Sequence, residues 1–169
     1  MKYFLLLFLA AWIVGFTIFP TISLARVTPE DIINSKKEAY DKVAAKYSLL
    51  SKQKLEGLSK EIVQINKQRT DELDQIMVVQ AAILDEYERR TNGKDIEGIK
   101  KARYWITYAH EAVAYQAAKI YVFELNGEGR IKSDATSTVN LFQLELSSTR
   151  LKVINSQKIL EEVVSKNEN

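Results

Sequence analysis

The chain has 169 residues, with 24 Lys and Arg against 22 Asp and Glu, and a formal net charge of +2. This balance gives no electrostatic reason to expect nucleic-acid binding. The sequence has no cysteine and one histidine, which excludes disulfides, thiolate catalysis and zinc sites built from thiolates or several imidazoles. We therefore expect no metal and no cofactor.

The N-terminus has the three parts of a secretory signal peptide. A lone Lys2 precedes an apolar run over 3–19, Pro20 ends the run, and small residues stand at Ser23 and Ala25. This pattern predicts that residues 1–25 are removed by cleavage after Ala25. The run is also long enough for an uncleaved signal anchor, which would give membrane contact through 3–19 alone. In either case we expect export, to the cell envelope, the periplasm or the exterior.

Several helix-start features coincide just after this segment. Thr28 can cap a helix, Pro29 suits its first position, and Glu30 and Asp31 face the positive end of the helix dipole. The sequence therefore predicts a helix that begins at residue 29.

This helix is predicted to run unbroken over 29–91. Apolar residues recur every three or four positions, as in an amphipathic helix or coiled coil. They include Tyr40, Val43, Tyr47, Leu50, Leu55, Leu58, Ile62, Ile65, Leu73, Ile76, Ile83 and Tyr87. Gly57 is the one weak point, and a single glycine costs a helix only about 1 kcal/mol. Asn92 and Gly93 then favour the left-handed backbone that ends a helix.

Two further helices are predicted, over 96–125 and 134–165. Asp95 can cap the first of them, the glycine-rich connector 126–129 ends it, and Ser133 or Asp134 opens the last. Residues 166–169 should fray as a flexible tail. Since no proline occurs after Pro29, the whole exported part is predicted to be all-α.

Equal lengths suggest how these helices pack. The 58–91 half of the long helix and the two later helices each span about 30 residues, which predicts an antiparallel three-helix, coiled-coil-like bundle over 58–165. The half over 26–57 then lacks a partner within the chain, so it is a candidate extension for oligomerisation or partner binding. The alternative is a four-helix bundle in which the chain folds back near Gly57.

The first candidate binding surface lies on that extension. We call it the proximal stripe; if the helix stays straight, it exposes Ile32, Tyr40, Val43, Tyr47 and Leu50. Burying such a stripe gains roughly 1.5–3 kcal/mol per large side chain, so we expect self-association or capture of a partner helix there.

The second candidate surface lies on the helix predicted over 96–125. Six aromatic residues fall between Tyr104 and Phe123. At 100° per residue, Tyr104, Tyr108 and Tyr115 lie almost opposite the aliphatic face; we call these three the tyrosine strip. In one interpretation the helix is wedged between its neighbours and buried on both sides. In the other, the strip stays exposed to contact a protein or a glycan, because tyrosine combines apolar area with a hydroxyl.

Features of catalysis are weak throughout the sequence. His110 and Glu111 resemble the start of a zinc-protease motif, but Ala114 stands where the second histidine is needed. The carboxylates alternate with Lys and Arg, as on solvated helix surfaces. The connector 126–129 lacks the residues of a phosphate-binding loop.

We therefore expect a non-enzymatic scaffold or binding module, whose partner is a protein or a second copy of the chain. The alternative function is a membrane-tethered helical stalk or a component of secretion or envelope assembly. A carboxylate enzyme built around His110 is the least favoured hypothesis.

Overall fold

The computed structural model describes residues 28–166, and within them it is all-helical with no strand. The all-α prediction is confirmed for this part of the chain. The predicted signal segment, its cleavage at Ala25 and the end of the tail lie outside the described residues. None of the helices of residues 28–166 is long and apolar enough to cross a membrane.

Helix α2, Pro29–Ala44, begins where the sequence predicts. The Thr28 hydroxyl accepts a hydrogen bond from the Asp31 backbone N–H at 3.2 Å, and the Asp31 carboxylate accepts one from the Thr28 backbone N–H at 2.8 Å. These two bonds form a capping box, which satisfies backbone donors that a helix start leaves free. The bond from the Thr28 N–H, and then a further one from the Thr28 hydroxyl, hold the pKa of the Asp31 carboxyl below its ordinary value.

The prediction of one unbroken helix over 29–91 is wrong. The chain leaves the helix after Ala44 and starts helix α3, Leu49–Thr91, with Ser48 as the cap. Tyr47 is buried at this joint, and its hydroxyl accepts a hydrogen bond from the Gly127 N–H at 3.0 Å. The Glu128 carboxylate accepts from the Ser48 N–H at 2.9 Å. These distant partners fix the turn. Residues 45–48 themselves contain no glycine or proline that would indicate a turn in the sequence.

The alternative break near Gly57 is wrong as well. Gly57 lies inside α3, and a Cβ added there would meet no atom within 4 Å. The helix tolerates this glycine because its neighbours on both sides are good helix formers.

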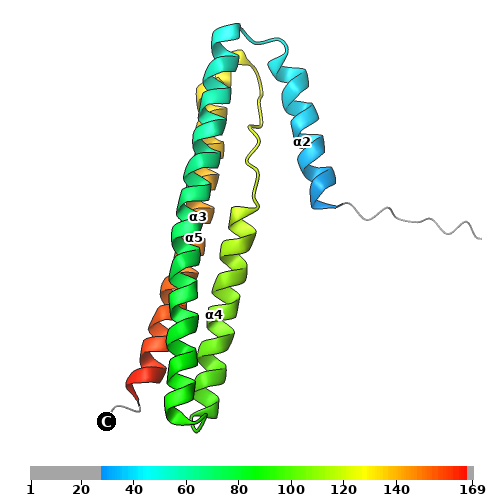
Figure 1. The fold of residues 1–169 in the computed structure, drawn as a ribbon. Coiled ribbons are helices and arrows are strands. Elements are labelled where there is room, and N and C mark those ends of the chain that lie inside the picture. The colour runs from blue at the N-terminus through cyan, green and yellow to red at the C-terminus, as the bar shows by residue number, and fades with distance from the viewer. Residues whose placement is uncertain (1–27, 167–169) are drawn as a thin grey trace, which may run out of the picture.

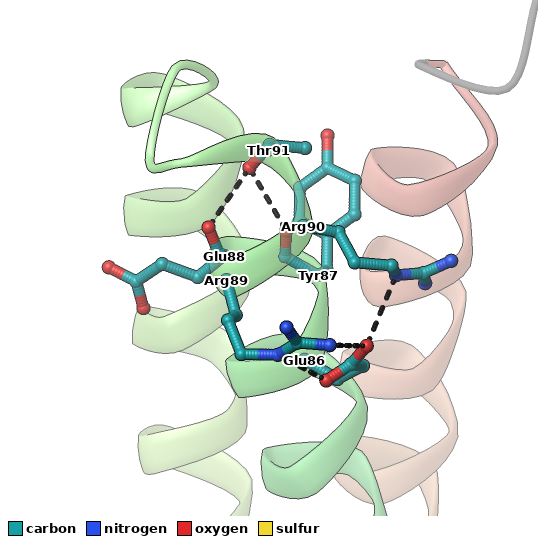
Figure 2. A network of polar contacts seen from close by, with 6 residues as sticks. All are labelled: Glu86, Tyr87, Glu88, Arg89, Arg90 and Thr91. Carbon is teal, nitrogen blue, oxygen red and sulfur yellow. Dashed lines mark hydrogen bonds and ion pairs between the residues drawn. The ribbon is translucent and has the colours of Figure 1, made fainter.

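Helix α3 ends as predicted, and Figure 2 shows its last turns. Asn92 adopts the left-handed conformation with φ 50°, and Gly93 follows with φ 67°. Arg89 donates two hydrogen bonds to the Glu86 carboxylate, at 2.7 and 2.9 Å, and Arg90 lies 3.6 Å from the same carboxylate. Cations in the last turn also interact favourably with the negative end of the helix dipole.

Helix α4, Ile96–Ala117, is shorter than the predicted 96–125. Residues 118–127, which we call the linking segment, are not helical. The 43 residues of α3 span about 64 Å, whereas the 22 residues of α4 cover only about 33 Å. At roughly 3.3 Å per residue, an extended linking segment adds about 33 Å and reaches the far end of α3. A helical continuation would fall short of the contacts at Tyr47 and Ser48.

A short 3-10 turn, Glu128–Arg130, leads into helix α5, Ile131–Ser165, which starts three residues before the predicted 134. The Asp134 carboxylate accepts a hydrogen bond from the Asn126 N–H at 2.8 Å, so it ties the end of the linking segment to the first turn of α5. This bond lowers the pKa of Asp134. Burial opposes the shift, but the pKa stays below its ordinary value.

Helices α3, α4 and α5 pack side by side, while α2 leans away from them across the linking segment (Figure 1). The first core lies among α3, α4 and α5. Its buried residues are Leu73, Met77, Leu84, Tyr87, Ile99, Ala102, Ile106, Ala109, Val113, Val153, Leu160 and Val163. The second core lies at the other end, where the linking segment and α2 meet α3 and α5. Its buried residues are Tyr47, Leu55, Ile62, Phe123, Ala135 and Phe142.

Candidate functional site

The tyrosine strip lies on the surface of α4. Tyr104 is 65% exposed, Tyr108 40% and Tyr115 71%. The opposite side of α4 supplies Ile99, Ile106 and Val113 to the first core. The interpretation in which α4 is buried on both sides is therefore wrong, because α3 and α5 both approach α4 from its aliphatic side.

The rings of the tyrosine strip are arranged in an ordered way. Tyr104 and Tyr108 are stacked, with ring centroids 6.4 Å apart and an interplanar angle of 4°. Trp105 meets both rings edge-on, with centroids 5.6 Å and 5.8 Å away. Both geometries are favourable for aromatic pairs, so the rings hold one another in place on the surface.

Two lysines stand over these rings. The Lys152 ammonium, on α5, lies 4.9 Å from the Tyr108 centroid, and the Lys119 ammonium lies 4.9 Å from that of Tyr115. A cation at this distance is attracted by the ring quadrupole, by about 0.5–1 kcal/mol at exposed sites. The strip is therefore an aromatic surface with the positive charge of Lys152 on the edge that faces α5, while the charge of Lys119 is offset by Glu145, 2.9 Å away.

The proximal stripe does not form one surface. Tyr47 is buried in the second core, and Tyr40 and Val43 pack against that core. Ile32 is 50% exposed and Leu50 61%, but they belong to different helices on the two sides of the joint. The chain itself covers the central residues of the stripe, so self-association through all five is no longer expected.

A polar network, which the sequence does not reveal, closes the end of α4. Gln116 is buried and donates to the Asn66 amide oxygen at 2.9 Å and to the Tyr121 hydroxyl at 2.8 Å. Tyr121 in turn donates to the Glu145 carboxylate at 2.6 Å. Burial is the main cause, and the hydrogen bond to Glu145 the second, of a pKa for Tyr121 far above its ordinary value. Polar residues at core positions of α3 and α4 are the only sequence feature that could have indicated this network.

The Glu145 carboxylate also lies 2.9 Å from the Lys119 ammonium. Burial raises the pKa of Glu145, but the hydrogen bonds from Tyr121 and Lys119 outweigh it and leave this pKa below its ordinary value. The carboxylate is therefore ionised and committed to a structural role, because it accepts from both neighbours. It anchors the start of the linking segment to α5.

His110 and the clustered carboxylates lie on the surface of the helices. The His110 Nε2 lies 3.0 Å from the Asp74 carboxylate across α3 and α4, and both side chains are about half exposed. Asp71 pairs with Lys67, Glu72 with Arg69, and Glu86 with Arg89. Across residues 28–166, no group of three His, Asp or Glu side chains is placed to hold a metal ion.

An apolar groove of about 600 Å³ runs between α3 and α5. Ile76, Val79 and Ile83 line it from α3, and Leu160 and Val164 line it from α5. Glu72 and Glu161 stand at its rim, so its charged groups are acidic. The groove is a second exposed surface, on the side of the molecule where α4 is absent.

No protein-family model, no curated protein and no solved structure matches this chain. The function of the chain is therefore inferred from the chemistry of these surfaces and from the sequence.

Proposed function

We propose that the chain is an exported, non-enzymatic helical protein that binds a partner protein through the tyrosine strip of α4. The observation that supports this most strongly is the exposure of Tyr104, Tyr108 and Tyr115 in an ordered, stacked arrangement. Large aromatic side chains are enriched at protein interfaces, where they bury much area at low cost in conformational entropy. Grouped exposed apolar surface of this kind marks binding sites more often than chance.

The shape of the surface favours a protein as the partner. From Tyr104 to Tyr115 the strip follows about three turns of one helix, or roughly 16 Å. A helix face is convex, whereas small ligands prefer concave pockets. Lys152, over Tyr108, adds a positive charge that suits an acidic group at the edge of the partner, whereas the charge of Lys119 is offset by Glu145. A glycan that stacks on the rings is the competing partner.

Export is proposed from the sequence alone, because residues 1–27 lie outside the described part. If the signal is cleaved, the mature N-terminus is Arg26; if it is retained, the protein is a tethered stalk that starts at Met1. Mass spectrometry of the exported protein distinguishes these two forms by the residue found at its N-terminus.

Site-specific photo-crosslinking tests the binding proposal. A benzoylphenylalanine at Tyr115 should form an adduct with one partner protein in cell-envelope fractions, and Tyr108→Ser should abolish this adduct without loss of helix content. The control is the same probe at Val63, which is 58% exposed on α3. The proposal fails if Tyr115 gives no adduct, or if Val63 gives the same one. An adduct digested by glycosidases but not by proteases would identify a glycan instead.

A further inference from the structure

The middle of the linking segment, residues 120–125, has a backbone that no other part of the described chain pairs with. Residues 120–125 read Ile-Tyr-Val-Phe-Glu-Leu, a composition that favours β-strands. Within residues 28–166, no backbone N–H or C=O of residues 120–125 makes a hydrogen bond; such bonds end at the Lys119 N–H and resume at the Asn126 N–H. Ile120 and Glu124 are exposed, Tyr121, Val122 and Leu125 are half-buried, and Phe123 is buried, so a partner can reach the segment on both sides of Phe123.

A cavity of about 450 Å³ lies along the side of the segment that faces α5, but side-chain bonds cross it. Lys119 and Tyr121 both bind the Glu145 carboxylate, at 2.9 and 2.6 Å, and Asn126 binds Asp134 at 2.8 Å. An added strand could enter there only by breaking these bonds.

On the side that faces α2 and α3, the exposed Lys36–Glu124 ion pair is the only bond that residues 120–125 make to these helices within residues 28–166. A cavity of about 390 Å³ follows this side, with Tyr40, Ile120 and Phe123 in its lining. A second cavity of about 310 Å³ adjoins it at Tyr40 and Phe123 and continues along α2 as far as Asn126. Side chains of α2 therefore leave free space beside the backbone of the segment.

Helix α2 is held in a way that allows it to move. One exposed ion pair, Lys36 to Glu124 at 2.8 Å, joins it to the linking segment, and Tyr40 and Val43 pack on the second core. The non-helical joint at 45–48 connects it to α3. A hinge of a few residues outside regular helix is enough for a helix to swing as one body.

We propose that residues 120–125 dock an extended peptide strand of a partner protein along the edge that faces α2 and α3, with α2 closing over it. An extended backbone is the partner that this edge fits, because it alone offers donors and acceptors in the alternating order of a strand. This site is separate from the tyrosine strip and does not depend on it.

The side chains indicate which strand fits. Lys37, Lys60, Asp41 and Glu56 stand in the lining of the larger cavity, so two cations balance two anions. Tyr40, Ile120 and Phe123 make the rest of it apolar. A strand with no net charge, and with an apolar side chain that enters the cavity beside Phe123, suits this lining.

The test uses a phage library of linear twelve-residue peptides, panned against the full chain. Selected peptides are then added to ¹⁵N-labelled protein, and amide exchange is measured by NMR. Strand pairing protects alternate amides of residues 120–125 and leaves those between them unprotected, because successive N–H groups point to opposite edges. Each peptide is also made with single N-methyl groups. N-methylation at paired positions should weaken binding by about three- to tenfold, and methylation at the intervening positions provides the matched control.

Three results would overturn the proposal. One is that panning yields no peptide that protects any amide of residues 120–125. Another is that peptides bind but protect a surface of α3, α4 or α5 instead. The last is that N-methylation weakens binding equally at all positions, which indicates recognition through side chains alone.

Discussion

The two ends of this molecule close their cores by different means. At the first core three helices meet, and α3, α4 and α5 each supply a regular apolar face. At the second core α4 has ended, and the linking segment and α2 take its place with Phe123, Tyr40 and Val43. Helices satisfy their own backbone, whereas the backbone of residues 120–125 has no hydrogen-bond partner in the described chain. The comparison shows that the same bundle is self-sufficient at one end and open to a backbone partner at the other.

The largest expected effect comes from the first core. Leu84 is buried there, and Leu84→Ala should lower the free energy of unfolding by about 2–5 kcal/mol, because three packed helices cannot collapse onto the cavity. Leu151→Ala on the exposed face of α5 is the control and should change stability by less than about 0.5 kcal/mol. Urea denaturation followed by circular dichroism measures both. Equal effects of the two variants would show that Leu84 is not enclosed as described.

At the second core, substitutions in α2 should act locally. Val43→Lys replaces a partly buried side chain that packs on this core, and should cost about 1–2 kcal/mol. Leu50→Lys lies just past the joint on an exposed position and should cost little. Hydrogen exchange should show α2 released in the first variant while α4 keeps its protection. Global unfolding by Val43→Lys would mean that the two cores are not separable.

The predictions from sequence succeeded where the determinants are local. The start at Thr28, the end at Asn92 and the cap at Asp95 each depend on residues within one turn. The joint at 45–48 depends on partners 80 residues away, Gly127 on Tyr47 and Glu128 on Ser48. The end of α4 depends on Asn66, 50 residues before Gln116. Apolar spacing continues through both places, so periodicity alone predicts helix there.

The candidate sites were predictable to different degrees. The sequence places Tyr104, Tyr108 and Tyr115 together, but only the structure shows them exposed. It also groups Tyr40, Val43 and Tyr47, which the fold turns inward. The open backbone of residues 120–125 could not be anticipated, because those residues fit the apolar pattern of the helix before them.

A smaller effect tests where the chain bends. Gly57→Ala should stabilise the protein by about 0.5–1 kcal/mol, because alanine costs less in a helix and the added Cβ meets open space. Thermal unfolding measures this shift. A loss of stability would instead indicate a bend at Gly57.

The smallest effect concerns Glu128, which lies in the 3-10 turn before α5 and binds Ser48 at the joint between α2 and α3. Hydrogen bonds from Ser48, and then from the Ser51 hydroxyl, hold the pKa of the Glu128 carboxyl below its ordinary value. A carboxylate with a lowered pKa stabilises the fold above its unfolded pKa and loses this contribution as pH falls through the folded pKa. Glu128→Gln should therefore be less stable than the original at pH 7. The difference in the free energy of unfolding between the two proteins should shrink below about pH 4.5. A difference that stays constant down to pH 2 would contradict this role of the Glu128 carboxylate.

Hydrogen exchange on the unmodified protein tests most directly whether the two ends are closed differently. The account predicts slow exchange for the α4 amides around Ala102, Ala109 and Val113, which lie in the first core, and fast exchange for residues 120–125, whose N–H groups have no partner in the described chain. Slow exchange throughout residues 120–125, equal to that of α4, would show that the helix continues as its sequence pattern suggests. That result would contradict the open edge at the second core.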